Sequence, residues 1–159
     1  MAASITVGPA TDADLPVVRA LIEEYCRWID MDLAFQEIEA ELDGLPGDYT
    51  PPGGLLLLAR MEGTPVGVAA YRRLDDRVCE MKRLYVQAHA RGQGLSRSLV
   101  MTLMTDAARA GYREMRLDTL PKMGAAQQLY ESLGFRDIPP YYDTPIAGTR
   151  FMACELREK

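Results

Sequence analysis

The chain has 159 residues, of which 48% are hydrophobic and 26% charged, values typical of one folded globular domain. The formal net charge of −5 argues against a nucleic-acid binder that works by bulk electrostatics, and it weakly favours a cationic partner. The only histidine is His89, which poorly supplies a histidine-based zinc site or a Ser-His-Asp triad, so we expect no metal.

The cysteines and the apolar segments bear on the compartment. The 3 cysteines are widely spaced and form no CxxC pair, which is typical of reduced cysteines in a reducing compartment. Residues 1–15 lack the basic and apolar regions of a signal peptide, and the longest apolar run, residues 55–59, is too short to span a bilayer. We therefore expect a cytoplasmic protein without a membrane segment.

The N-terminal half predicts a strand, two helices and three further strands. Residues 11–30 carry apolar side chains at helical spacing, which predicts an amphipathic helix. The glycines and prolines of residues 43–54 cannot continue a helix and predict a long surface loop. The predicted elements are a strand at 4–10, helices at 11–30 and roughly 35–42, and strands at 55–61, 66–74 and 77–86.

The C-terminal half alternates helices and strands. A helix with one apolar face begins near Leu95, and Gly134 is placed to end a later helix. The remaining predicted elements are a strand at 114–120, a helix at 122–133 and a last strand at 149–156. The whole chain, residues 1–159, is expected to be one domain of the α/β (α+β) class, with a mixed central sheet covered by helices.

Two glycines, Gly92 and Gly94, precede the helix that begins near Leu95. Glycines let the backbone approach an anion closely, and the first N–H groups of a helix attract it. No lysine follows as in a Walker A loop. Arg97 replaces the third glycine of a dinucleotide fingerprint, and residues 87–91 lengthen its turn too far. The spacing alone leaves two interpretations open, an anion-binding helix start and a glycine-rich helix start with solvated arginines.

The run from Cys79 to Phe135 resembles the Gcn5-related N-acetyltransferase (GNAT) superfamily. The family's pyrophosphate motif, Arg/Gln-x-x-Gly-x-Gly/Ala, falls on residues 91–96, with Ser96 in the last position. A strand precedes it, an amphipathic helix follows, and "LYESLGF" comes about 35 residues later. The resemblance implies a GNAT-like, mostly antiparallel sheet of about six to seven strands with helices on both faces.

The resemblance also implies a reaction and its donor. Acetyl-CoA would donate an acetyl group directly to a primary amine in a ternary complex. The pantetheine would pair with the main chain of one strand, and the pyrophosphate would lie on the amides of the glycine-rich loop. The residues expected to bind the donor are Leu84, Tyr85, Val86, Arg91, Gly92, Gln93, Gly94, Leu95, Ser96 and Arg97.

Two side chains are candidates for proton transfer. Glu80 is a carboxylate within an apolar strand, where partial burial would raise its pKa, and the resemblance places a catalytic glutamate there. The alternative is a cross-strand pair with Arg72 or Arg73. Tyr130 lies on the apolar face of its helix, where it is either a core tyrosine or, as the resemblance implies, the general acid.

The acceptor side is less defined. Adjacent Lys82 and Arg83 interrupt the alternation of their strand and predict a β-bulge. The sequence does not distinguish among three classes of acceptor: a small amine, an amino acid, and a peptide or protein amine. The alternative function is a non-catalytic, acetyl-CoA-binding regulatory module, and a homodimer is an expectation by analogy only. Four aromatic residues lie in segments that flank the acceptor in this family, so they are expected to line its pocket: Trp28, Tyr49, Tyr141 and Tyr142.

Overall fold

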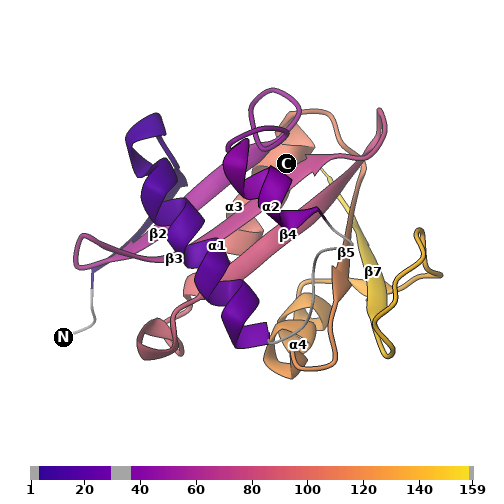
Figure 1. Ribbon diagram of the computed structural model, residues 1–159. Coiled ribbons are helices and arrows are strands. Elements are labelled where there is room, and N and C mark those ends of the chain that lie inside the picture. The colour runs from indigo at the N-terminus through magenta and orange to yellow at the C-terminus, as the bar shows by residue number, and fades with distance from the viewer. Residues whose placement is uncertain (1–3, 30–36, 158–159) are drawn as a thin grey trace.

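The computed structural model describes residues 4–29 and 37–157 (Figure 1). Short 3-10 turns precede the first and third helices, at Asp12–Asp14 and Ala88–Ala90. The helices and strands are β1 (Ile5–Pro9), α1 (Leu15–Ile29), α2 (Ile38–Asp43), β2 (Leu55–Met61), β3 (Thr64–Arg73), β4 (Val78–Val86), α3 (Leu95–Arg109), β5 (Glu114–Thr119), α4 (Gly124–Ser132), β6 (Arg136–Asp137) and β7 (Arg150–Glu155).

One sheet of 7 strands organises the described part of the chain, in the order β1-β2-β3-β4-β5-β7-β6. Every neighbouring pair is antiparallel except β4 and β5, which run parallel. In Figure 1, α1 and α2 lie in front of the sheet and α3 lies behind it. This arrangement confirms the predicted mixed, mostly antiparallel sheet with helices on both faces.

The leucine run of β2 shows why the sheet is covered on both faces. Alternate side chains of a strand point to opposite faces, and a strand buried on both reads as a continuous apolar run. Leu55 and Leu57 pack in the cluster that includes α3 and α4, whereas Leu56 and Leu58 pack against α1. Leu57 and Leu58 are fully buried, so truncating either to alanine would cost about 2–5 kcal/mol of stability.

The strands β4 and β5 separate halfway along their length. Only Val78 to Glu80 of β4 pair with β5, and the last pair is Glu80 with Arg116. Against β3, Ala70 faces Lys82 and Val68 faces Tyr85, so two residues of β4 lie opposite one of β3. The extra residue is Arg83, whose φ is 64°. The predicted β-bulge is therefore confirmed, and it lies beside the point where the two strands diverge.

Two differences from the predicted elements are local. The second helix spans Ile38–Asp43, and the first two residues of its predicted range lie outside the described residues. Strand β6 pairs with β7, and its 2 residues are too few to leave a pattern in the sequence. Gly134 does end α4, with φ 98°. In the described segments no helix has the length and apolar content needed to cross a bilayer.

Candidate active site

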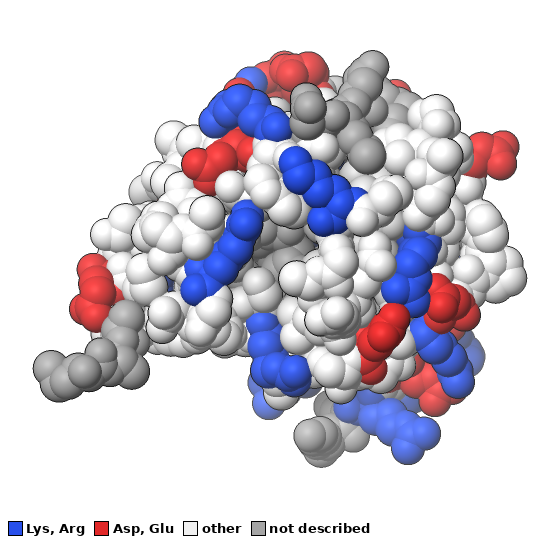
Figure 2. Space-filling model, turned by 90° about the horizontal axis from the view of Figure 1, so that it is seen from below, with Lys and Arg blue, Asp and Glu red and all other residues white. Residues whose placement is uncertain are grey.

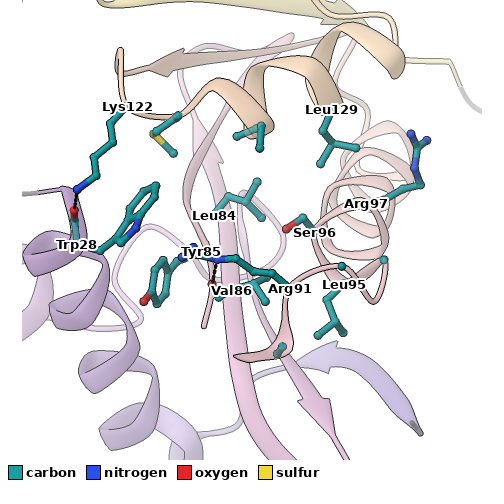
Figure 3. A pocket seen from close by; sticks show the side chains of 16 residues that line it. Trp28, Leu84, Tyr85, Val86, Arg91, Leu95, Ser96, Arg97, Lys122 and Leu129 are labelled. Atoms are coloured by element: carbon teal, nitrogen blue, oxygen red, sulfur yellow. Dashed lines mark hydrogen bonds between the residues drawn. The ribbon is translucent and has the colours of Figure 1, made fainter. Parts of the chain in front are cut away.

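A cleft of about 320 Å³ lies between the second half of β4, the start of α3 and α4 (Figures 2 and 3). All the residues predicted to bind the donor line it, except Gln93. The full lining is Trp28, Leu84, Tyr85, Val86, Ala90, Arg91, Gly92, Gly94, Leu95, Ser96, Arg97, Lys122, Met123, Ala125, Ala126 and Leu129. The sequence-predicted set is therefore brought together in one place.

The glycine-rich loop places the start of α3 at this cleft. Gly92 and Gly94 both have φ 80°, a left-handed conformation that side chains disfavour. Because α3 begins at Leu95, the N–H groups of Leu95, Ser96 and Arg97 have no acceptor within the helix. No hydrogen bond joins them to another residue in the described part of the chain. Figure 3 shows the Ser96 side chain pointing into the cleft, so these groups are available to an anionic ligand.

Cations surround the mouth of the cleft. The guanidinium of Arg91 lies 5.1 Å from the ring of Trp28, and its Nε donates to the Val86 carbonyl at 2.9 Å. The Lys122 ammonium lies 5.1 Å from the centroid of the same ring and donates to the Trp28 carbonyl. Figure 2 shows Lys and Arg side chains around a hollow, and those lining the cleft are Arg91, Arg97 and Lys122. The local charge therefore suits an anion, although the chain is acidic overall.

A smaller chamber of about 30 Å³ lies next to the cleft, and Leu84 and Met123 line both spaces. Its lining is Tyr25, Met81, Lys82, Arg83, Leu84, Asp118, Leu120, Met123 and Tyr130. By volume it holds about one or two water molecules or the end of an amine. The Tyr130 side chain is 2% exposed, and burial raises the pKa of its hydroxyl, which therefore stays protonated at neutral pH.

Glu80 is held through both of its carboxylate oxygens. Arg72 Nε lies 3.0 Å from Oε1, and the Tyr141 hydroxyl donates to Oε2 at 2.6 Å. Arg72 and Glu80 are cross-strand partners, which is the alternative that the sequence left open. Glu80 is 2% exposed and lines neither the cleft nor the chamber. Its role as a base stays a prediction.

Two consecutive tyrosines bind carboxylates on the two diverging strands. Tyr141 donates to Glu80 of β4, and Tyr142 donates to Oδ2 of Asp118 on β5. Both rings also pack on Phe151, with centroid distances of 5.2 and 5.1 Å. The segment before β7 is thereby fixed over the opening between β4 and β5.

The other two aromatic candidates lie apart from this pair. Tyr49 donates to Glu41 Oε1 at 2.9 Å, and Glu41 Oε2 lies 2.8 Å from Arg83 Nε. Burial acts to raise the pKa of Glu41, but the hydrogen bond and charge of Arg83, together with the Tyr49 hydrogen bond and the charge of Lys82, hold that pKa below its usual value. Trp28 lies in the cleft with the predicted donor-binding residues, whereas the sequence placed it on the acceptor side.

The comparisons with known proteins agree with this geometry. The sequence model of the acetyltransferase (GNAT) family matches residues 15–135. The chain belongs to the GNAT acetyltransferase family. A Schizosaccharomyces pombe protein named as an uncharacterized N-acetyltransferase is 40% identical over 145 residues, which cover 90% of this chain and 89% of the relative. As a GNAT member, the chain is an acyl-CoA-dependent N-acyltransferase.

Solved structures share the GNAT fold. An acetyltransferase of the GNAT family from Staphylococcus aureus Mu50 has a TM-score of 0.81, covers 97% of this chain and 100% of its own, and is 20% identical. The PaiA N-acetyltransferase from Thermoplasma acidophilum, solved in complex with coenzyme A, has a TM-score of 0.76. It covers 96% of this chain and 99% of its own at 17% identity.

Three site residues of this GNAT chain were missed by the sequence reasoning: Asp118, Lys82 as part of the chamber, and Lys122. Asp118 had a signal, because charged residues occupy every second position of β5 and share one face. Lys82 follows Glu80 by two residues and shares its face, yet its position was used only to predict the bulge. Lys122 had no signal, because its contact with Trp28 joins residues that are distant in sequence.

Proposed function

We propose that the chain transfers an acetyl group from acetyl-CoA to a primary amine by direct attack in a ternary complex. The observation that carries the proposal is the open helix start at Leu95, Ser96 and Arg97, facing a cation-lined cleft that lies next to a chamber lined by Tyr130. A loop of this kind binds an anion at the mouth, and the chamber gives a buried place for the reacting groups.

The residues present fit the donor. The N–H groups at the start of α3 and the nearby Arg91, Arg97 and Lys122 provide charge-assisted contacts for a pyrophosphate. No atom lies within 4 Å of a Cβ placed on Gly92 or Gly94, so these glycines leave space on the ligand side. The second half of β4, released from β5, supplies main-chain groups for the pantetheine at Leu84 to Val86. Bound there, the donor supplies the activated thioester.

The amine must lose a proton before it attacks. An alkyl ammonium with a pKa near 10.4 loses its proton at neutral pH at a cost of roughly 4–5 kcal/mol, so a carboxylate beside the amine helps. Glu80 serves this role only after Tyr141 releases Oε2. Asp118 lines the chamber, and among the described residues Tyr142 bonds only its Oδ2. In the arrangement with Tyr141 in place, Asp118 is therefore the carboxylate better placed to receive the proton.

Tyr130 supplies the proton for the departing thiolate. Tyr130 lines the chamber, and its hydroxyl stays protonated because burial raises its pKa. None of the hydrogen bonds among the described residues uses this hydroxyl, so no structural bond competes with a catalytic one. This assignment keeps the predicted general acid.

One experiment tests the function and its alternative together. Trp28 is the single tryptophan of the chain and lies in the cleft, so its fluorescence reports binding of coenzyme A. Thiol release from acetyl-CoA is then measured with a panel of small amines, amino acids and peptides. Amine-dependent release, with N-acetylated product, supports the proposed function. A fluorescence change without amine-dependent release would instead identify a non-catalytic donor-binding module.

A further inference from the structure

Lysine is rare in this chain, and one of the lysines is buried in the chamber. Lysine and arginine together number 18, yet lysine stands only at positions 82, 122 and 159. Lys82 is 7% exposed, whereas Lys122 is exposed at the cleft mouth. An amine within the chamber of an N-acyltransferase is chemically equivalent to the amine that the enzyme acylates.

The strand register places Lys82 and Asp118 on the same face of the sheet. Glu80 and Arg116 form the last pair between β4 and β5, so they share a face of the sheet. Lys82 and Asp118 each follow by two residues, which returns both side chains to that same face on the two diverging strands. Both line the chamber together with Tyr130. One small space thus contains an amine, a carboxylate and a phenol.

The surroundings of Lys82 favour its neutral, nucleophilic form. Burial is the largest effect and lowers the pKa of the Lys82 ammonium, and the charge of Arg83 lowers it further. Glu80 and Asp118 act in the opposite direction without reversing the shift, and Arg72 adds to it. A larger fraction of Lys82 is therefore uncharged at neutral pH than for an exposed lysine.

We propose that Lys82 is itself an acyl acceptor: when no external amine occupies the chamber, the enzyme acetylates Lys82 Nζ with its own bound donor. The proposal rests on the proposed function, because it uses the same donor and the same chamber. The product carries no charge and adds an acetyl group to a space of about 30 Å³. Acetylated Lys82 therefore fills the chamber and blocks transfer to external amines.

The reaction balances without an oxidant or a further reactant. Lys82 first loses one ammonium proton to Asp118, which passes it to solvent. Lys82 Nζ then bonds to the carbonyl carbon of the thioester, and the carbon–sulfur bond breaks. Tyr130 gives a proton to the departing thiolate and is reprotonated by the proton that leaves the nitrogen. The products are an acetyl-lysine, a free thiol and one proton.

Burial separates this reaction from chemical acetylation by free acetyl-CoA. A reagent in bulk solution reaches the exposed Lys122 more easily than Lys82, which is 7% exposed. A donor bound in the cleft lies beside the chamber, because Leu84 and Met123 line both spaces. Enzymatic transfer therefore favours Lys82, and chemical transfer favours Lys122.

The test incubates the full chain with acetyl-CoA and no amine, then maps acetylation by chymotryptic peptide mass spectrometry. We expect a single acetyl group on Lys82, formed faster than any on Lys122. Lys82→Arg keeps the positive charge and abolishes the modification, while the control Lys159→Arg leaves it unchanged. Tyr130→Phe slows it by about a hundredfold, within the range for losing a general acid.

Two results would overturn the inference. One is an unmodified Lys82 in protein whose Trp28 fluorescence shows bound coenzyme A. The other is modification at equal rates in wild type, in Tyr130→Phe and in urea-denatured chain, since that rate would be chemical. Thiol release with the amine panel is measured on the same preparation. Release with Lys82 unmodified refutes only this inference, whereas absent coenzyme A binding refutes the proposed function as well.

Discussion

The hydroxyl of Tyr141 donates a hydrogen bond of 2.6 Å to Oε2 of Glu80, a carboxylate buried in the sheet and 61 positions away in the sequence. Arg72 holds the other oxygen at 3.0 Å. Glu80 therefore stabilises the segment over the β4–β5 opening in this conformation. A proton can reach its Oε2 only after Tyr141 moves.

Replacing Tyr141 by phenylalanine should destabilise the fold. The change removes one donor from a carboxylate that is 2% exposed, and an unsatisfied buried acceptor costs about 1–3 kcal/mol. The measurement is the free energy of unfolding in urea. Tyr142→Phe is the matched control, because it removes the equivalent bond to Asp118, which is half-buried, and should cost less. Equal losses for the two variants would show that burial of Glu80 does not set the difference.

Glu80→Gln and Asp118→Asn, compared side by side, identify the proton acceptor. With Tyr141 in place, we expect Asp118→Asn to lower kcat by about a hundredfold or more and Glu80→Gln to lower it less. The measurement is steady-state thiol release with the best amine of the panel. A larger loss in Glu80→Gln would support the role that the sequence predicted for Glu80 and would require the Tyr141 segment to open during turnover.

Tyr130→Phe should separate chemistry from folding and donor binding. The loss of the acid should lower kcat by about 10²–10⁴-fold, while coenzyme A affinity, followed by Trp28 fluorescence, stays the same. Stability should change by less than about 1 kcal/mol, because no hydrogen bond of the described residues uses the hydroxyl. Unchanged turnover would reject Tyr130 as the general acid.

Gly94→Ala tests the donor loop, and Gly63→Ala is its matched control. Gly94 and Gly63 have φ 80° and 81°, and no atom lies within 4 Å of a Cβ on either. Each substitution should therefore cost about 1–2 kcal/mol of backbone strain. Gly63 lies in the turn between β2 and β3, so only Gly94→Ala should also weaken coenzyme A binding. Equal affinities for the two variants would contradict an anion site at the start of α3.

The Glu41–Arg83 pair should make the free energy of unfolding depend on pH in the acid range. The folded-state pKa of Glu41 lies below its usual value of 4.5, because Arg83, Tyr49 and Lys82 together outweigh the opposing effect of burial. The stabilisation is therefore complete above about pH 4.5 and is lost as the pH falls through the folded-state pKa. Unfolding free energies measured against pH should lose this part of their slope in Glu41→Gln. An unchanged slope would show that other carboxylates dominate.

The fold was largely predictable, because its signals are local. The alternation of residues 55–58 between the two faces of the sheet and the conformation of Gly134 follow from short-range rules of strand and helix geometry. The donor loop was also predictable, since the glycine spacing by itself requires an unusual backbone. The role of Asp118 was not, because it depends on which strands are neighbours and where they diverge. Trp28 lies in the cleft with the predicted donor-binding residues because of the direction of its side chain, which the sequence does not give, and its place on the acceptor side stays a prediction.

The most direct test of the central claim is amine-dependent thiol release from acetyl-CoA, with the acetylated product identified by mass spectrometry. We expect one N-acetylated amine for each thiol released, a strong decrease in Tyr130→Phe, and unchanged coenzyme A binding in that variant. Coenzyme A binding to the cleft without release on any primary amine would contradict it.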